Sequence, residues 1–596
     1  MSVPILSEGP FSMREEDLRS WFDNKEFHKM TVEFISFFEH FRDKTYLGLT
    51  EREKSELNRS VLVFFFYMSN QDFMLGGEKN IVSLIKLNYT ISNVVAISDF
   101  GTTDAVLRIL VNQKSNFAKL LVLYSARNFI KLDYRKLFEA NSSLSSLWYF
   151  CFMEMHRTGP SDALALRNLN EHIDFDDDRI IGINEFMNCA YFGSTYINHQ
   201  NDDSVKRRVN SIIQSLPIAN KRFYFNKSAG ARSIVVATAM WKPLHSVYRS
   251  QQPFMEELAK NYRLILVKLG DDTSNIDSSL FSDVRHYSLK KGDDFSAFDI
   301  GDFSAVYFPD VGMSMESIVL ANLRISDVQI ANYGHPVSTY GAKIDYWIGG
   351  KETEIPSLST RHYSEKLILI DGCGQAPVPL CYEPCKPRLS PNKIIINCAW
   401  TAQKIHFNHL SNLREILSRS GRGVVFRFYP AGFTGQNGFI PLKRSIQEIL
   451  GEESVEIYPN LSQFDYLKSL EMAHFALDSF PFGGYNTAID LLTLRIPIVC
   501  LEGTKFFNKS TPYLLRKIGL SELVASCAQE FIDKSIRMIS DDVYRDSIRR
   551  TLEKVDLFET VLCKKDVRSF VKAIDCILLN SGDPDFARSR VPYFIH

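Results

Sequence analysis

The feature that most constrains the fold is a repeated alternation of short apolar runs with helical segments after about Asn220. The runs are IVVATAM, RLILVKL, AVYFP, VQIANYG and KLILI, and helix patterns such as PFMEELAKNY lie between them. Near-continuous apolar strands that alternate with helices are typical of a parallel sheet covered on both faces. We therefore predict a doubly wound, Rossmann-like α/β domain in this part of the chain.

The alternation stops at residues 373–391 and then restarts. The interrupting stretch, CGQAPVPLCYEPCKPRLSP, is rich in proline and is typical of an extended linker. After it come KIIINCAW, VVFRFYP, SVEIYP, FALDSF and IPIVCLE, with a helical pattern between each run and the next. Two Rossmann-like halves therefore stand in tandem. Ligands of such sheets bind outside the carboxyl ends of the strands, so we expect a site in the cleft between the halves.

The first third of the chain has a different periodicity. From Arg14 to about Leu216 apolar residues recur at helical spacing, as in DLRSWFDNKEFHKMTVEFISFFEHF. No repeat period is evident, so we do not predict a solenoid. The chain has 596 residues, which is too many for one core and implies about three domains. We predict an all-α domain at 1–220 and α/β domains at 221–380 and 381–596, the last with a helical tail.

Composition narrows the class of protein. The formal net charge of -1 leaves no basic footprint for nucleic acid. The N-terminus lacks the basic start and apolar core of a signal peptide, and the most apolar run, VLVFFFYM, is far too short to span a bilayer. The 10 cysteines show no zinc-like spacing and suit reduced thiols. We expect a cytoplasmic multidomain protein with no membrane span and no nucleic-acid partner.

Four candidate segments come directly after predicted strands. His245 follows IVVATAM, His335 follows VQIANYG, Thr401 and Lys404 follow KIIINCAW, and SFPFGGYNTAID overlaps the end of FALDSF. Histidines can act as bases near neutral pH, and Lys404 can neutralise a leaving diphosphate. Taken singly, each histidine is more often a structural hydrogen-bonding group and Lys404 a solvated surface lysine. Their common position after strands is what indicates a site.

The stretch SFPFGGYNTAID combines a turn with a helix start. Gly483 and Gly484 allow a sharp turn and close approach of the backbone to a ligand. Asn486 or Thr487 can cap the next helix, whose free N–H groups and dipole suit a phosphate. Asp490, one turn further on, can accept hydrogen bonds from ribose hydroxyls. An ordinary capped helix with an acid in its first turn accounts for the same residues equally well.

Metal ligands are not predicted. DFDDD at Asp174–Asp178 and DPD at Asp583–Asp585 match the short pattern by which some sugar transferases hold a divalent ion. The first stretch lies in the helical part and the second in the tail, both away from strand ends, so solvated acidic loops are the better interpretation. Lys404 and helix N-termini would then carry the charge of a leaving diphosphate without a metal.

Five blocks taken together resemble a known family. They are HSVYRS, ANLRISDVQIANYGHPVSTYGAKIDY, WTAQK, Tyr466–Leu467 and SFPFGGYNTAIDLLTLRIPIV. In this order, from about Val235 to Gly519, they resemble the bacterial cytoplasmic N-glycosyltransferases that modify high-molecular-weight adhesins, which are relatives of the O-GlcNAc transferases. The resemblance implies a GT-B fold, in which two Rossmann-like halves face a nucleotide-sugar cleft, preceded by an all-α domain.

The resemblance also implies an activity. It is an inverting, metal-independent transfer of a hexose, usually glucose, from a UDP-sugar to an acceptor protein such as an adhesin or autotransporter. The acceptor in the bacterial branch is Asn in an Asn-x-Ser/Thr sequon, and no cofactor is implied besides the donor. Lys404 matches the lysine on the UDP phosphates, with Thr401 beside it, and Asn486, Thr487 and Asp490 match the segment that holds phosphate and ribose. His245 and His335 match active-site histidines.

The chain departs from the family pattern at three places. YPN at Tyr458–Asn460 replaces His-Pro-His at the uridine contacts, GGYN stands where relatives often have GNTN, and STY follows GHPV where relatives have Thr-Thr-His. The donor hexose therefore stays open. So do O-glycosylation of Ser/Thr, extension of a protein-linked glycan, and a degenerate protein that binds nucleotide-sugar without turnover. An epimerase would need cleft carboxylates that the sequence pattern does not offer.

Overall fold

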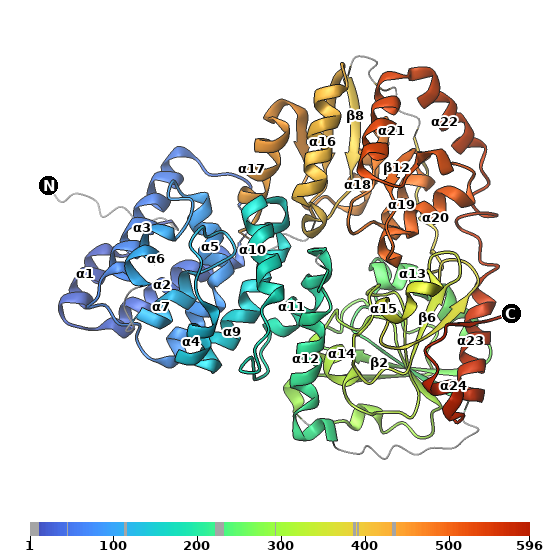
Figure 1. The fold of residues 1–596 in the computed structure, drawn as a ribbon, viewed down its shortest axis with the longest axis horizontal. Coiled ribbons are helices and arrows are strands. Elements are labelled where there is room, and N and C mark those ends of the chain that lie inside the picture. Colours follow the sequence, from blue (N-terminus) through green and yellow to red (C-terminus); the bar gives the residue numbers. More distant parts are fainter. Residues whose placement is uncertain are drawn as a thin grey trace. The chain divides into compact units, whose positions relative to one another are not determined.

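The chain divides into two compact units. The computed structural model describes residues 11–44, 46–111, 116–198, 200–220, 232–292, 294–385, 389, 393–431 and 437–596, and Figure 1 draws their fold. One unit comprises Met1–Asn201, Trp400–Ser411 and Phe428–Leu461, and the other Asp202–Ala399, Asn412–Arg427 and Ser462–His596. The domain boundaries predicted at 220 and 380 stay predictions.

The first part of the chain is helical, as predicted. Its helices are α1 (Glu15–Asp23), α2 (Phe27–Asp43), α3 (Glu51–Ser69), α4 (Glu78–Lys86), α5 (Asn88–Ile97), α6 (Asp104–Leu110), α7 (Phe117–Leu123), α8 (Tyr134–Ala140), α9 (Ser142–Phe152), α10 (Ala163–Asp174) and α11 (Phe186–Gly193). A capping box between Thr50 and Glu53 starts α3. The ring of Phe64 meets those of Phe34 and Phe38 edge to face, with centroids 5.1 and 4.9 Å apart. Burial of each such ring contributes about 1.5–3 kcal/mol, so packed aromatic rings hold these helices together.

Within the described ranges, no single helix is long and apolar enough to cross a bilayer. Helices α4 and α5 reach that length and composition only as a pair, and they are bent by 57° where they meet.

The first α/β sheet has eight parallel strands in the order β14-β7-β6-β5-β4-β1-β2-β3. They are β1 (Ser233–Thr238), β2 (Arg263–Leu269), β3 (Asp283–Tyr287), β4 (Ala305–Phe308), β5 (Gln329–Ala331), β6 (Tyr346–Gly350), β7 (Lys366–Ile370) and β14 (Tyr593–Phe594). Val235 of β1 pairs with Ile265 on one side and Val306 on the other. The strand order therefore reverses between β1 and β4.

The second sheet repeats this plan with six strands, in the order β10-β9-β8-β11-β12-β13. They are β8 (Lys393–Cys398), β9 (Gly423–Phe428), β10 (Val455–Ile457), β11 (Phe475–Leu477), β12 (Ile498–Leu501) and β13 (Val524–Ala525). The strand order reverses between β8 and β11, which are parallel neighbours. Residues 373–385, in the predicted linker, contain no helix or strand. The two-sheet architecture predicted from the alternation is confirmed.

Helices accompany both sheets (Figure 1). They are α12 (Ser204–Gln214), α13 (Ser246–Leu258), α14 (Met315–Ala321), α15 (Ser359–His362), α16 (Phe407–Arg419), α17 (Phe439–Leu450), α18 (Gln463–Glu471), α19 (Tyr485–Thr493), α20 (Ser510–Lys517), α21 (Ala528–Ser540), α22 (Asp542–Lys554), α23 (Val567–Asn580) and α24 (Pro584–Arg588).

The end of the chain returns to the first sheet. Phe570 of α23 stacks on Phe254 of α13 with ring centroids 4.6 Å apart, and both rings belong to the core of that sheet. Tyr593 then pairs with Ile368, which adds β14 beside β7. The sequence pattern grouped this tail with residues 381–596, and nothing local in it reveals the return.

Candidate active site

In both sheets, polar residues follow the strands at the reversal of strand order. In open α/β sheets this is where the loops diverge and leave room for a ligand. In the first sheet the segments after β1 and β4 lead to His245 and Asp310. In the second sheet, Thr401 and Lys404 follow β8, and the turn at 478–484 follows β11.

His245 is the N-cap of α13. Its Nδ1 accepts a hydrogen bond from the backbone N–H of Val247 at 3.2 Å. Burial, assisted by the nearby charge of Lys242, lowers the pKa of His245 to about 4. The ring is therefore neutral at pH 7, and because Nδ1 is an acceptor its hydrogen lies on Nε2. In this arrangement His245 offers a hydrogen-bond donor rather than a free base.

Arg249, one turn into α13, forms a buried ion pair with Asp490 of α19. Arg249 Nη2 lies 2.5 Å from Asp490 Oδ1, and the two side chains are 11% and 8% exposed. Burial raises the pKa of Asp490, and the guanidinium opposes that shift. Asn486 Nδ2 also donates to the carbonyl oxygen of Ser246 at 3.0 Å. The starts of α13 and α19 are thus held against each other by two polar contacts.

The turn before α19 differs in one respect from its prediction. The helix begins at Tyr485 with Gly484 as N-cap, and no side chain caps it. Asn486 and Thr487 therefore lie in the first turn and are not the cap that their residue types suggested. Asp478 Oδ1 accepts from Gly484 N at 3.1 Å. A Cβ on Gly483 would lie 2.8 Å from the carbonyl oxygen of Phe507, so close backbone packing requires this glycine.

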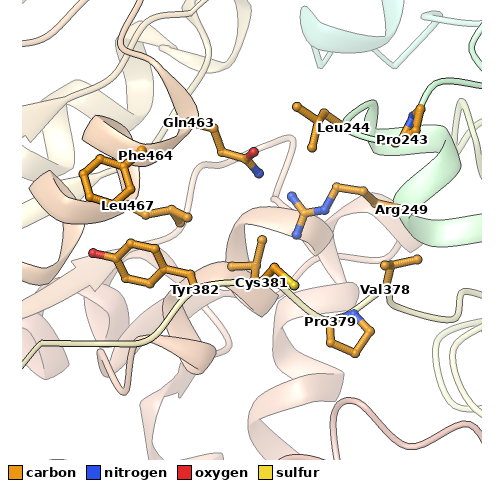
Figure 2. Close-up of a pocket in the computed structure, with 11 residues that line it drawn as sticks. Pro243, Leu244, Arg249, Val378, Pro379, Cys381, Tyr382, Gln463, Phe464 and Leu467 are labelled. Carbon is orange, nitrogen blue, oxygen red and sulfur yellow. The ribbon is translucent and has the colours of Figure 1, made fainter. Parts of the chain in front are cut away.

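A pocket of about 250 Å³ opens beside the Arg249–Asp490 pair. Its walls come from the start of α13, the linker at 378–382 and the start of α18. Figure 2 shows the Arg249 guanidinium and the Gln463 amide directed into this space, with the ring of Tyr382 below them. Leu467, part of the Tyr-Leu block noted in the sequence, completes one wall. Polar groups converging on an apolar-walled hollow are typical of a small-molecule site.

His335 is buried, with 1% of its surface exposed. Its Nε2 lies 3.0 Å from Nζ of Lys206, which belongs to α12. Burial holds the pKa of His335 well below its ordinary value, and the charge of Lys206 adds to the effect. This imidazole is therefore neutral at pH 7.

Thr401 and Lys404 belong to the other compact unit. Thr401 is the N-cap of a short 3-10 helix, Ala402–Lys404. Its Oγ1 is buried and makes no hydrogen bond to any described residue. Lys404 is half-buried at the end of that helix. A hydroxyl in such a place is available to a ligand oxygen.

No metal centre is assembled by the residues that the structure describes: no three His, Cys, Asp or Glu side chains are grouped to hold an ion. In the acidic stretch at 174–178, Asp177 pairs with Arg179 at 2.7 Å. That contact lowers the pKa of Asp177 to about 2.

Comparison with known proteins identifies the class. The chain is 24% identical over 488 residues to a UDP-glucose:protein N-beta-glucosyltransferase of Actinobacillus pleuropneumoniae serotype 5b (strain L20), covering 74% of each protein. It is 25% identical over 491 residues to the protein of that name from serotype 7 (strain AP76), again over 74% of each. Its fold matches a mutant of Thermobaculum terrenum O-GlcNAc transferase with a TM-score of 0.57 and 17% identity, over 86% of this chain and 99% of that one. The chain is a glycosyltransferase of the GT-B fold.

A further relative matches a smaller part of this glycosyltransferase. The chain is 26% identical over 256 residues to the probable UDP-N-acetylglucosamine--peptide N-acetylglucosaminyltransferase SPINDLY of Petunia hybrida. The match covers 40% of this chain and 26% of that protein. No protein-family profile matches the chain. The family resemblance noted in the sequence is confirmed as homology to the two glucosyltransferases.

In this glycosyltransferase the structure brings some of the predicted residues together. Asn486 and Asp490 reach the start of α13, where His245 is the N-cap. Lys206 of α12 contacts the imidazole of His335. The roles assigned to these residues, and those of Thr401, Lys404, Gly483, Gly484 and Thr487, stay predictions.

Sequence reasoning missed Asp310 of the glycosyltransferase. It follows β4 and is fully buried. Its Oδ2 accepts hydrogen bonds from Thr238 Oγ1 at 2.9 Å, Ala239 N at 3.2 Å and Met240 N at 3.1 Å. Asp310 thus fixes the first residues of the loop that leads to His245. The rule that singled out His245, a polar residue after a buried strand, applies equally to Asp310 in AVYFPD.

Asp310 gives the glycosyltransferase a testable pH dependence. Burial raises the pKa of this carboxyl to about 6, against about 3.9 in an unfolded chain. Between these values the folded state keeps a proton that the unfolded state has lost, so stability falls as pH rises. Relative to Asp310→Asn, we expect the free energy of unfolding of the wild type to fall by about 1.4 kcal/mol per pH unit from pH 4 to 6. Denaturant unfolding of both proteins across this window measures the difference. A constant difference across that window would contradict the assignment.

Proposed function

We propose that this enzyme transfers glucose from UDP-glucose to a protein side chain, namely Asn in an Asn-x-Ser/Thr sequon, with inversion at the anomeric carbon. The observation that carries the proposal is the contact between α13 and α19. There a buried carboxylate, an uncapped helix start and a pocket of about 250 Å³ come together at the reversal of strand order. The names of the two Actinobacillus relatives support both the donor and the protein acceptor.

Each part of the donor has a matching group. The uncapped N–H groups of α19 suit the phosphates. For Lys404 and Thr401 we keep the phosphate-binding role that the sequence predicts, as an ammonium and a hydroxyl donor. Asp490 suits the ribose hydroxyls, which would share its carboxylate with Arg249. Tyr458 stacks on Tyr429 with ring centroids 5.9 Å apart. Within its own unit, this pair offers an aromatic face that suits a uracil ring.

The chemistry is one displacement. The acceptor nitrogen attacks the anomeric carbon while the bond from that carbon to the UDP oxygen breaks, and the electron pair leaves with UDP. The nitrogen then gives up a proton to water. His245, neutral with its hydrogen on Nε2, serves this step as a donor that orients the sugar or acceptor. A single histidine does not account for activation of an amide, which is a poor nucleophile.

Mass spectrometry of an acceptor panel tests the function. Peptides with Asn-x-Thr, Gln-x-Thr and isolated Ser/Thr would be incubated with UDP-glucose, UDP-galactose or UDP-GlcNAc. We expect a hexose on Asn-x-Thr alone, from UDP-glucose. Modification of Ser/Thr or of a preformed glycan would replace the proposed acceptor. Binding of UDP with neither hydrolysis nor transfer would instead identify a degenerate binding protein.

Metal independence is a separate prediction. We expect unchanged initial rates after dialysis against EDTA, because a lysine and helix N–H groups neutralise the leaving UDP in the proposed mechanism. The measurement is UDP release with and without the chelator, and with added Mg²⁺ or Mn²⁺. A rate that disappears in EDTA and returns with either ion would refute a metal-free displacement.

A further inference from the structure

Helix α12 carries a polar stripe that recognises one loop. Lys206, Asn210 and Gln214 recur every four residues and so share one face of the helix. Asn210 Nδ2 donates to the carbonyl oxygen of Thr339 at 2.7 Å, and Gln214 Nε2 donates to that of Gly341 at 2.8 Å. The loop they hold, residues 335–341, begins with His335. It contains the STY sequence, Ser338–Tyr340.

That loop is held in an unusual conformation. Tyr340 has a φ of 50°, in the left-handed region that bulky residues rarely adopt, and is 4% exposed. Glu365 adds a hydrogen bond from the backbone N–H of Thr339 at 2.9 Å. Such a conformation persists only where the surroundings fix it, and these conformations cluster at functional sites.

Lys206 is the member of the stripe that reaches the imidazole. It is fully buried, and its Nζ lies 3.0 Å from His335 Nε2. An ammonium has only donors, so Nε2 accepts and the hydrogen of the neutral ring lies on Nδ1. A hydrogen bond that fixes the protonation of one ring nitrogen determines whether the other nitrogen donates or accepts. His335 can then present Nδ1–H as a donor, while Nε2 is occupied.

Burial and the neighbouring carboxylates act on the charge of Lys206 in opposite directions. Burial lowers the pKa of Lys206 to about 7, with Lys505 acting in the same direction, while Asp202, Asp203 and Glu365 raise it. Asp202 is itself 4% exposed and accepts a hydrogen bond from Lys505 Nζ at 2.6 Å. The acceptor at Nε2 favours the ammonium further. Burial of an isolated lysine charge would destabilise the folded state. The contact of Lys206 with His335 therefore indicates a role for this lysine beyond packing.

We propose that Lys206 is a positioning residue that fixes His335 as its Nδ1–H tautomer, so that His335 acts in the transfer reaction as a hydrogen-bond donor and not as a base. This inference rests on the proposed transfer reaction. It also assigns a task to α12, a helix that the sequence placed in the all-α domain.

Kinetics supply one test. In Lys206→Met the ring loses its fixed tautomer while the cavity stays filled. We expect kcat to fall on the order of 10²-fold with the donor KM within about twofold, as for a misplaced active-site group. Lys206→Gln, whose amide can still donate, should recover part of the loss. Lys260→Met, which removes a largely exposed lysine paired with Glu257, is the control and should keep wild-type rates. Equal losses in the Met and Gln variants would overturn the role.

A double-mutant cycle shows whether Lys206 acts through His335. His335→Gln combined with Lys206→Met should be no slower than His335→Gln alone, because the two changes remove the same function. Additive losses would overturn the proposal.

Nitrogen NMR of ¹⁵N-histidine-labelled protein, with His335→Gln for assignment, reads the tautomer without any activity. We expect a protonated Nδ1 in the wild type and a mixture in Lys206→Met. A protonated Nε2 in the wild type would overturn the inference even if transfer occurs. A protonated Nδ1 in a protein without transferase activity would support the assigned tautomer and contradict only the proposed function.

Discussion

Lys404→Ala should lower kcat for transfer by about 10³-fold, close to 4 kcal/mol of transition-state stabilisation. UDP leaves with negative charge growing on its β-phosphate, and the largest contributions to such reactions come from fixed positive groups that meet the developing charge. Lys404 comes directly after β8, at the reversal of strand order in the second sheet. Peptide glucosylation followed by mass spectrometry and UDP release by a coupled assay would both report the loss.

The matched control is Lys393→Ala. Lys393 is an exposed lysine that begins the same strand, at its amino end, away from where ligands bind. Lys393→Ala should leave the rate of transfer unchanged. This variant measures the effect of removing a nearby lysine charge by itself. Near-normal turnover in Lys404→Ala would remove this residue from the mechanism.

Asp490→Asn should damage both stability and donor binding. The substitution leaves the Arg249 guanidinium, whose side chain is 11% exposed, without its counter-charge. Breaking a buried pair from one side costs about 3–5 kcal/mol of unfolding free energy. We also expect the dissociation constant for UDP to rise at least about tenfold, because a charge-assisted acceptor for the ribose hydroxyls is lost. Denaturant unfolding and calorimetric titration with UDP measure the two effects.

A double variant separates the two roles of Asp490. Arg249→Met with Asp490→Leu replaces the ion pair by apolar groups of similar volume, a change that is often neutral or stabilising. Stability should return towards wild type while UDP affinity stays low. Recovery of both would mean that Asp490 contributes to packing alone, and full UDP affinity in the single variant would exclude it from the donor site.

Most of the strands that local sequence predicts are central ones. RLILVKL and KLILI correspond to β2 and β7 residue for residue, because a strand buried on both faces is mostly apolar along its length. Of the missed strands, β6 is central and fully buried, whereas β3, β13 and β14 lie at sheet edges. β3, DVRHY, lies at the edge with exposed Arg285 and His286, and β14 has two exposed residues. Edge strands need neither an apolar run nor great length, so only their pairing identifies them.

The candidate site could be predicted where it depends on chain order and not where it depends on distant contacts. The rule that ligands bind after strands selected His245 and the turn at Gly483–Gly484, and would have selected Asp310 had it been applied to AVYFPD. The Arg249–Asp490 pair joins residues 241 positions apart, which no spacing rule can anticipate. Lys206 was hidden for another reason. Its stripe looks like the solvated face of a helix until the loop at 335–341 is seen to cover it.

The return of the chain end joins the two α/β sheets a second time. The polypeptide passes from the first sheet to the second between β7 and β8, and passes back between β13 and β14. A protease cut between β7 and β8 would therefore leave the two sheets covalently connected through the later crossing.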